Sequence, residues 1–150
     1  MFFLFSVVGC SSSQKQTGPS RVSNWAYIPS SIVINPLSRI RTNEDPTKAS
    51  VIVHIELQDG DGFSCRGVGE LLITITSASG NNVDTKTYDL GDPKRNLELF
   101  DYVTRTYRIE LLTGAEVPFV LVRASFDGGD SKTLRSKEKE LINNSTSISN

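Results

Sequence analysis

Apolar and polar residues alternate along several stretches of this 150-residue chain. In the clearest stretch, residues 51–58, every second residue is apolar and His54 belongs to the opposite row. A period of two is typical of a β-strand with one buried face, so we expect His54 to point outward. The predicted inward row consists of Val51, Val53, Ile55 and Leu57.

Three further stretches share this pattern and predict further strands. Their expected inward rows are Leu71, Ile73 and Ile75; Val103, Tyr107, Ile109 and Leu111; and Val120, Val122, Ala124 and Phe126. The alternation also places Arg105 in the second row, where we expect its charged head to reach water or Asp101. Residues 32–34 precede Pro36 and are typical of an edge strand, because proline cannot donate to a central ladder. Residues 83–90 and 132–136 alternate less regularly.

Residues that favour turns separate these stretches, at 59–62, 79–82, 113–114 and 127–130. Short strands at this spacing predict an all-β fold, an antiparallel sandwich of about seven strands. One interruption is helical in character, because Asp92 suits an N-cap and Pro93 suits the first helical position. We expect a short helix over 94–100 that connects the two sheets, with Leu97 and Phe100 packed on the rim.

The two ends of the chain differ from this body. Residues 11–24 are almost entirely polar, which predicts a flexible tether. Residues 136–150 are rich in charged residues, asparagine and serine, which predicts a polar, disordered tail. The folded domain is therefore expected to occupy residues 25–135.

The first ten residues, MFFLFSVVGC, form an apolar run that ends in Val8-Gly9-Cys10. This pattern resembles the lipobox of bacterial lipoproteins, in which the cysteine is lipidated and becomes the mature N-terminus. The resemblance implies a signal peptide at 1–9, a tether at 10–24 that begins with lipidated Cys10, and membrane anchoring by acyl chains such as palmitate. Ser11 resembles the residue found after the cysteine in lipoproteins sent to an outer membrane. The implied location is the bacterial cell envelope, at the outer membrane, facing the periplasm or the cell surface.

Secretory signals usually begin with basic residues. None precedes Cys10, which favours a start codon upstream of Met1. The alternative is an apolar N-terminal tail with an incidental cysteine. A transmembrane helix is disfavoured, because spanning requires about 20 apolar residues.

In residues 51–75 an apolar strand ends in Asp59-Gly-Asp-Gly62, and a Gly-Glu-Leu-Leu-Ile-Thr-Ile strand returns after a variable stretch. The segment resembles the opening of immunoglobulin-like and transthyretin-like extracellular modules, which implies that type of sandwich. The whole chain also resembles small, uncharacterised bacterial lipoproteins with a single β-sandwich. Trp25 and Cys65 do not match the core tryptophan and paired cysteines of antibody domains.

Charge and composition narrow the classes of function. Lys and Arg number 16 against 17 Asp and Glu, and no basic patch stands out, so we expect no nucleic-acid partner. His54 is the only histidine, there is no Gly-x-Ser-x-Gly motif, and zinc needs clustered ligands. We therefore expect neither a cofactor nor catalysis. With Cys10 lipidated, Cys65 has no intramolecular partner, and we expect it to be buried.

Two groups of residues are candidates for binding. Arginine and tyrosine are enriched at interface hot spots, and the candidates for partner binding are Arg105, Arg108, Arg123, Tyr88, Tyr102 and Tyr107. The candidates for calcium binding are four loop carboxylates, those of Asp59, Asp61, Asp127 and Asp130. They would coordinate the ion if their loops met at one end of the sandwich. Asp-Gly pairs are also typical of tight turns without any metal.

These features favour a lipid-anchored, non-catalytic module that binds an unknown envelope protein or polymer through sheet edges and end loops. One alternative is a hydrolase or carbohydrate-active domain that uses the four loop carboxylates. Another is a structural envelope component that associates with itself.

Overall fold

A computed structural model of the chain describes residues 28–144, except 78, 81, 130 and 131. The expected signal peptide, Cys10, the expected tether and Trp25 lie outside the described residues, as do Asp130 and residues 145–150 of the expected tail.

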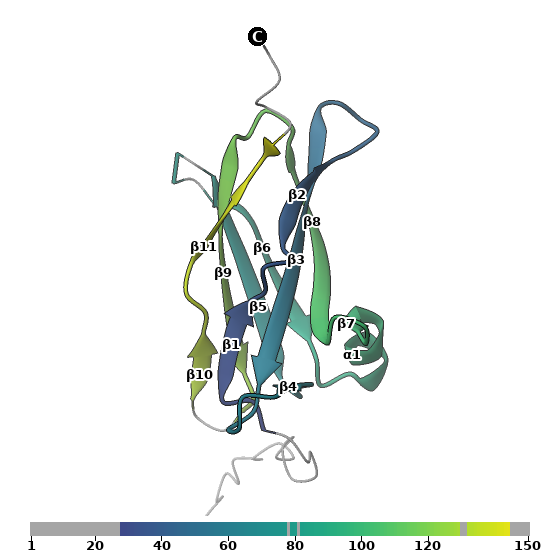
Figure 1. Cartoon of the computed structure of the whole chain (residues 1–150), viewed down its shortest axis with the longest axis vertical. Helices are drawn as coiled ribbons and strands as arrows, with labels where there is room; N and C mark the ends of the chain where they lie inside the picture. The colour runs from purple at the N-terminus through teal and green to yellow at the C-terminus, as the bar shows by residue number, and fades with distance from the viewer. Residues whose placement is uncertain (1–27, 78, 81, 130–131, 145–150) are drawn as a thin grey trace, which may run out of the picture.

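Eleven strand segments in the described part form two antiparallel sheets. Sheet A contains β1 (Ser31–Ile34), β2 (Arg39–Thr42), β3 (Lys48–Gln58), β4 (Ser64–Cys65), β7 (Phe100–Asp101) and β8 (Thr106–Gly114). Sheet B contains β5 (Glu70–Ser77), β6 (Asn82–Asp89), β9 (Phe119–Asp127), β10 (Thr133–Arg135) and β11 (Lys139–Ile142). The two sheets form the layers of an elongated sandwich (Figure 1), which confirms the predicted all-β class.

One edge of each sheet is an interrupted strand. β1 and β2 both pair with β3, and β10 and β11 both pair with β9. Pro36 falls in the first interruption, which confirms the predicted edge strand at residues 32–34. β11 lies inside the segment 136–150 that was expected to be a disordered tail, and that prediction is wrong for residues 139–142. The short strand was missed because only Leu141 of its four residues is buried.

The inward rows of the long strands fill a single core between the sheets. The rows predicted for β3, β5 and β9 are buried as expected. In β8 the row is buried from Tyr107 onward, but Val103 is 93% exposed and precedes the strand. Arg105 is likewise outside the sheet, in the turn before β8, with a left-handed backbone at φ 56°. The predicted inward position of Val103 is therefore wrong, because the strand begins later than the alternation suggests. Arg105 is exposed, which agrees with the expectation that its head reaches water.

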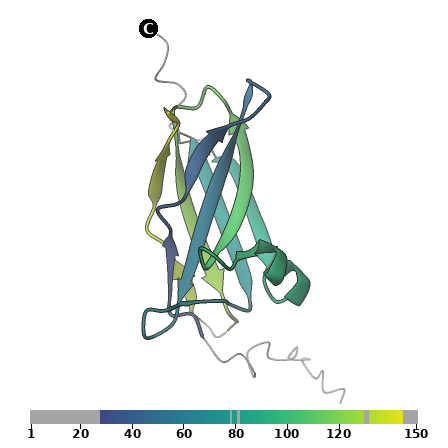
Figure 2. The same cartoon turned by 45° about the vertical axis from the view of Figure 1, so that its right-hand side comes forward.

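The predicted helix is present as α1 (Pro93–Leu99) and lies beside the lower end of β8 (Figure 2). Asp92 caps it, with its Oδ1 accepting a hydrogen bond from the Lys94 amide at 3.0 Å. Phe100 is buried as expected, whereas Leu97 is half exposed. No helix in the described part of the chain is long and apolar enough to cross a membrane.

Asn96 holds this helix to the sandwich. Its side chain is 1% exposed and its Nδ2 donates to the carbonyls of Gly67 and Leu90, both at 2.7 Å. Its Oδ1 accepts from Arg66 Nε at 3.0 Å and from the Tyr107 hydroxyl at 3.1 Å. One buried polar side chain thus connects the helix, the segment before β5 and the core of sheet A.

Candidate binding site

The middle strand of sheet A is buried on both of its faces. Ser50, Ile52 and His54 point away from the core, yet they are only 1%, 0% and 4% exposed. The prediction that His54 lies on an outward, exposed face is therefore wrong as to exposure. The reason is that β3 lies between β2 and β8, both of which carry long side chains on this outer face. The register places Arg39 beside Ile52 and Arg108 beside His54.

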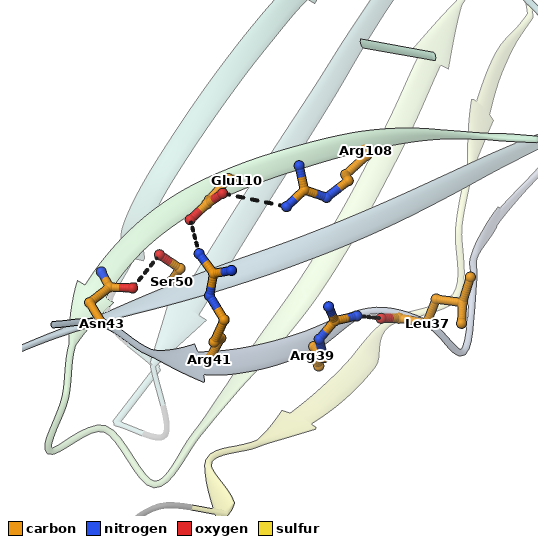
Figure 3. A network of polar contacts seen from close by, with 7 residues as sticks. All are labelled: Leu37, Arg39, Arg41, Asn43, Ser50, Arg108 and Glu110. Atoms are coloured by element: carbon orange, nitrogen blue, oxygen red, sulfur yellow. Dashed lines mark hydrogen bonds and ion pairs between the residues drawn. The ribbon is translucent and has the colours of Figure 1, made fainter. Parts of the chain in front are cut away.

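Three arginines and one carboxylate lie on this face, and we call Arg39, Arg41, Arg108 and Glu110 the arginine cluster (Figure 3). Arg41 Nη2 lies 3.3 Å from Glu110 Oε1, and Arg108 Nη2 lies 3.7 Å from Glu110 Oε2. Arg39 Nη1 donates instead to the carbonyl of Leu37 at 3.2 Å. The cluster therefore carries an excess of positive charge on one face of the sheet.

The side chains of the arginine cluster lie on the outer face of sheet A and are partly exposed to solvent. The side chains of Arg41, Arg108 and Glu110 are 55%, 44% and 38% exposed. Arginine can lay its aliphatic stem over an apolar neighbour while its guanidinium stays hydrated. This arrangement buries Ile52 and keeps the charged heads accessible. Leu37 and Leu112, which are 45% and 56% exposed, add apolar surface to the same sheet.

His54 lies opposite Arg108 of the arginine cluster in the pairing of β3 with β8. Its Nδ1 lies 2.9 Å from Thr106 Oγ1, which in turn lies 2.8 Å from Thr104 Oγ1. Burial lowers the pKa of His54 below its usual value, and the positive charges of Arg108 and Arg39 lower it further. The neighbouring Asp101 acts in the opposite direction. The ring is therefore neutral at pH 7, and the charge of the site comes from the arginines.

The structure does not bring the predicted partner-binding residues together on one surface. Tyr107 is 0% exposed and Tyr88 is 9% exposed, so neither is available to a partner. Arg123 lies on sheet B and forms an ion pair of 2.6 Å with Glu138. The burial of Tyr107 follows from the alternation, which places it on an inward row.

Two other predicted residues lie near the turn before β8. Arg105 Nη2 donates to the carbonyl of Ser64 at 2.8 Å, which joins this turn to β4. Tyr102 is 62% exposed and its ring packs edge-on against Phe100 at 5.2 Å. Of the predicted group, only Arg108 belongs to the arginine cluster.

Arg39 and Arg41 were missed as candidates. They stand two residues apart around Ile40, an alternation that places two arginines on the same face of a strand. The signal was short, since β2 has only four residues. Arg39 and Arg41 lie near Arg108 because β2 and β8 both pair with β3. The sequence pattern does not reveal this pairing.

Two of the loop carboxylates, Asp59 and Asp127, accept hydrogen bonds from backbone amides of their own turns. Asp59 Oδ1 accepts hydrogen bonds from the amides of Asp61 and Phe63, at 3.0 and 2.9 Å. Asp127 Oδ1 accepts from the Gly129 amide at 2.8 Å. Across the described residues, no three His, Cys, Asp or Glu side chains come together as a metal site. These contacts fit the turn interpretation of the Asp-Gly pairs.

Cys65 is buried, as the sequence predicts, and is a free thiol. Burial raises the pKa of its thiol to about 11, and the charge of Asp59 adds to the increase. The thiolate is the reactive form of cysteine, so this side chain is inert at neutral pH.

No known family model matches the chain, and comparison with curated proteins gives no match.

Proposed function

We propose that the protein is a non-catalytic binding module of the bacterial cell envelope, anchored to a membrane through a lipid on Cys10. Its binding site is the arginine cluster, and its partner is acidic. The observation that carries the proposal is that three arginines share the outer face of sheet A with a single carboxylate, which pairs with only two of them.

The chemistry of the cluster supports an anionic partner. A guanidinium group presents several donors in a planar arrangement that matches carboxylate and phosphate groups. Glu110 engages one nitrogen from each of Arg41 and Arg108, at 3.3 and 3.7 Å. The side chains of Arg41 and Arg108 are 55% and 44% exposed, so both are accessible to a partner. Arg39 forms no ion pair with a carboxylate in the described part of the chain, so its full charge is available to a partner.

The lipid anchor is proposed from the resemblance of Val8-Gly9-Cys10 to a lipobox. It would hold the domain at a membrane surface, where the partner is an envelope protein or an acidic polymer. Intact mass and membrane partition of the native protein beside Cys10→Ser test this part. Acyl mass and membrane retention, both lost in the variant, are expected. A soluble wild type that retains Met1 and carries no lipid would overturn the anchor.

We also propose that the sandwich is of the immunoglobulin-like type rather than the transthyretin-like type. The strand order supports this: β3 lies between the interrupted edge and β8 in sheet A, and β9 lies between the other interrupted edge and β5 in sheet B. The chain changes sheet after β4, after β6 and after β8. Such crossings are typical of the Greek-key connections in immunoglobulin-like domains.

Binding of poly-L-glutamate at low ionic strength tests the binding proposal. Each of Arg39→Ala, Arg41→Ala and Arg108→Ala is expected to weaken binding about fivefold, because an exposed charge contact contributes up to about 1 kcal/mol. Arg123→Ala is the matched control, since it removes the same charge from sheet B. Equal losses in all four variants would show a response to net charge alone and would contradict the proposed site. So would the absence of binding by the wild type.

A further inference from the structure

The outer edge of β8 is open over most of its length. On one side β8 pairs with β3, and on the other it pairs with β7 only through Thr106 and Tyr107. From Arg108 onward, no described strand lies along this edge, and both views show β8 at the margin of its sheet (Figures 1 and 2).

The pairing on the far side of β3 establishes which backbone groups of β8 face this open edge. The carbonyl of His54 accepts from the Asn35 amide at 2.8 Å, and the His54 amide donates to Ser38 Oγ at 2.9 Å. The backbone of His54 therefore faces the β1–β2 side. Backbone groups alternate in direction along a strand, so Val53 and Ile55 face β8.

Val53 and Ile55 are opposite Ile109 and Tyr107 of β8. The residues of β8 that alternate with Tyr107 and Ile109 therefore direct their backbone N–H and C=O groups away from β3. Arg108, Glu110 and Leu112 thus present their N–H and C=O groups to the open edge. Unpaired groups in such a row form a template for another strand.

We propose that the acidic partner is an extended polypeptide segment, which binds by adding as an antiparallel strand to the outer edge of β8 beside the arginine cluster. This inference rests on the proposed function, because it takes the acidic partner as given and specifies its form and binding mode. Strand addition gives affinity through main-chain hydrogen bonds and specificity through alternate side chains.

The side chains that border the edge specify the sequence of the added strand. On the outer face, a residue opposite Arg108 would be acidic, and a residue opposite Glu110 would be neutral or basic. A residue opposite Leu112, which is 56% exposed, would be apolar. On the inner face the neighbours are the buried rows of β8 and the core, so the alternate residues of the partner would be apolar.

The uninterrupted edge strand of sheet B is less suited to such a partner. β6 is the outermost strand of sheet B, and it carries Lys86 on an exposed position, paired with Asp84 at 3.6 Å. Lysine on an edge strand opposes the addition of further strands. β8 carries no lysine, and its charged side chains form part of the arginine cluster.

Two substitutions of Leu112 separate strand addition from charge attraction. Leu112→Pro replaces the leucine side chain and removes the outward N–H, whereas Leu112→Ala shortens the side chain and keeps the N–H. Proline is tolerated on an edge strand where its missing N–H would face solvent. Both variants leave Arg39, Arg41, Arg108 and Glu110 in place. Thermal melts of the two variants confirm that each is folded before binding is measured.

The probe is a synthetic peptide with valine at its inner-face positions and, on the outer face, aspartate opposite Arg108, threonine opposite Glu110 and valine opposite Leu112. The control peptide has the same sequence with N-methyl groups on the aspartate and threonine amides. We expect Leu112→Pro to bind the probe about tenfold more weakly than Leu112→Ala, and the N-methylated peptide to bind the wild type about tenfold more weakly. Hydrogen exchange of the Arg108, Glu110 and Leu112 amides in the wild type is expected to slow when the probe binds.

Each result has a defined consequence. Equal binding by the two Leu112 variants, or equal binding of the two peptides, would overturn strand addition. If the arginine variants still weakened binding in that case, the proposed function would stand without it. If the wild type bound neither the peptide nor poly-L-glutamate, the proposed function would fail and the inference with it.

Discussion

Removal of the negative charge of Glu110 is predicted to strengthen binding of an acidic partner while it weakens the fold. Glu110→Gln takes the carboxylate away from Arg41 and Arg108, which lie 3.3 and 3.7 Å from it. A carboxylate about 5 Å from a bound anion repels it by about 0.8 kcal/mol in water. Relief of this repulsion, with the release of two guanidinium groups, is expected to raise affinity about five- to tenfold at low ionic strength.

The same substitution removes two half-exposed ion pairs. Each contributes about 0.2–1 kcal/mol to stability, so the free energy of unfolding is expected to fall by at most about 2 kcal/mol. Stability and affinity thus change in opposite directions, which a general loss of structure would not produce.

The assay is titration of poly-L-glutamate into the wild type and Glu110→Gln, followed by anisotropy, with urea unfolding measured in parallel. Glu138→Gln is the matched control, because Glu138 pairs with Arg123 on sheet B at 2.6 Å and its loss changes the net charge equally. Weaker binding by Glu110→Gln, or an equal gain in Glu138→Gln, would refute the reasoning.

Three further predictions concern the framework of the site. Asn96→Ala leaves the Gly67 and Leu90 carbonyls without their 2.7 Å donor. We expect the free energy of unfolding to fall by about 3 kcal/mol and the melting temperature by about 10 °C. A decrease of less than 3 °C would contradict the role of Asn96. Thr113 has a buried hydroxyl without a hydrogen-bond partner among the described residues, so Thr113→Val is expected to stabilise the fold by about 1 kcal/mol in urea unfolding, and a loss of stability would count against this. Because the folded protein lowers the pKa of His54 below 6.5, the unfolded chain binds more protons in mildly acidic solution, and stability contributed by the neutral ring is lost as the pH falls below about 6.5. Melting temperatures at pH 7.5 and pH 5 are therefore expected to differ more in the wild type than in His54→Gln, and equal differences would show that His54 does not titrate as described.

The sandwich and its core were predictable because a period of two depends on the local sequence alone. The buried rows of β3, β5 and β9 follow directly from it. Burial of Ile52 and His54 on the outer face was not predictable, since their cover comes from β2 and β8 and depends on strand order. The helix start at Asp92 was predictable from capping chemistry, whereas the role of Asn96 depends on contacts with segments distant in sequence.

The candidate site was predicted only in part, for the same reason. Arg108 was identified as a candidate. Arg39 and Arg41 were not, because they lie near Arg108 only through the pairing of β2 and β8 with β3. Tyr107 illustrates the opposite error, because residue type suggested an interface while the alternation placed its side chain in the core.

The central claim is that an acidic partner binds on the outer face of sheet A. The most direct test is a map of amide chemical shifts of the domain as the acidic valine-alternating peptide is added. We predict that the largest changes fall on residues 37–43 and 106–113, around the arginine cluster and the open edge of β8. Changes centred on sheet B, or none at saturating peptide, would contradict the claim.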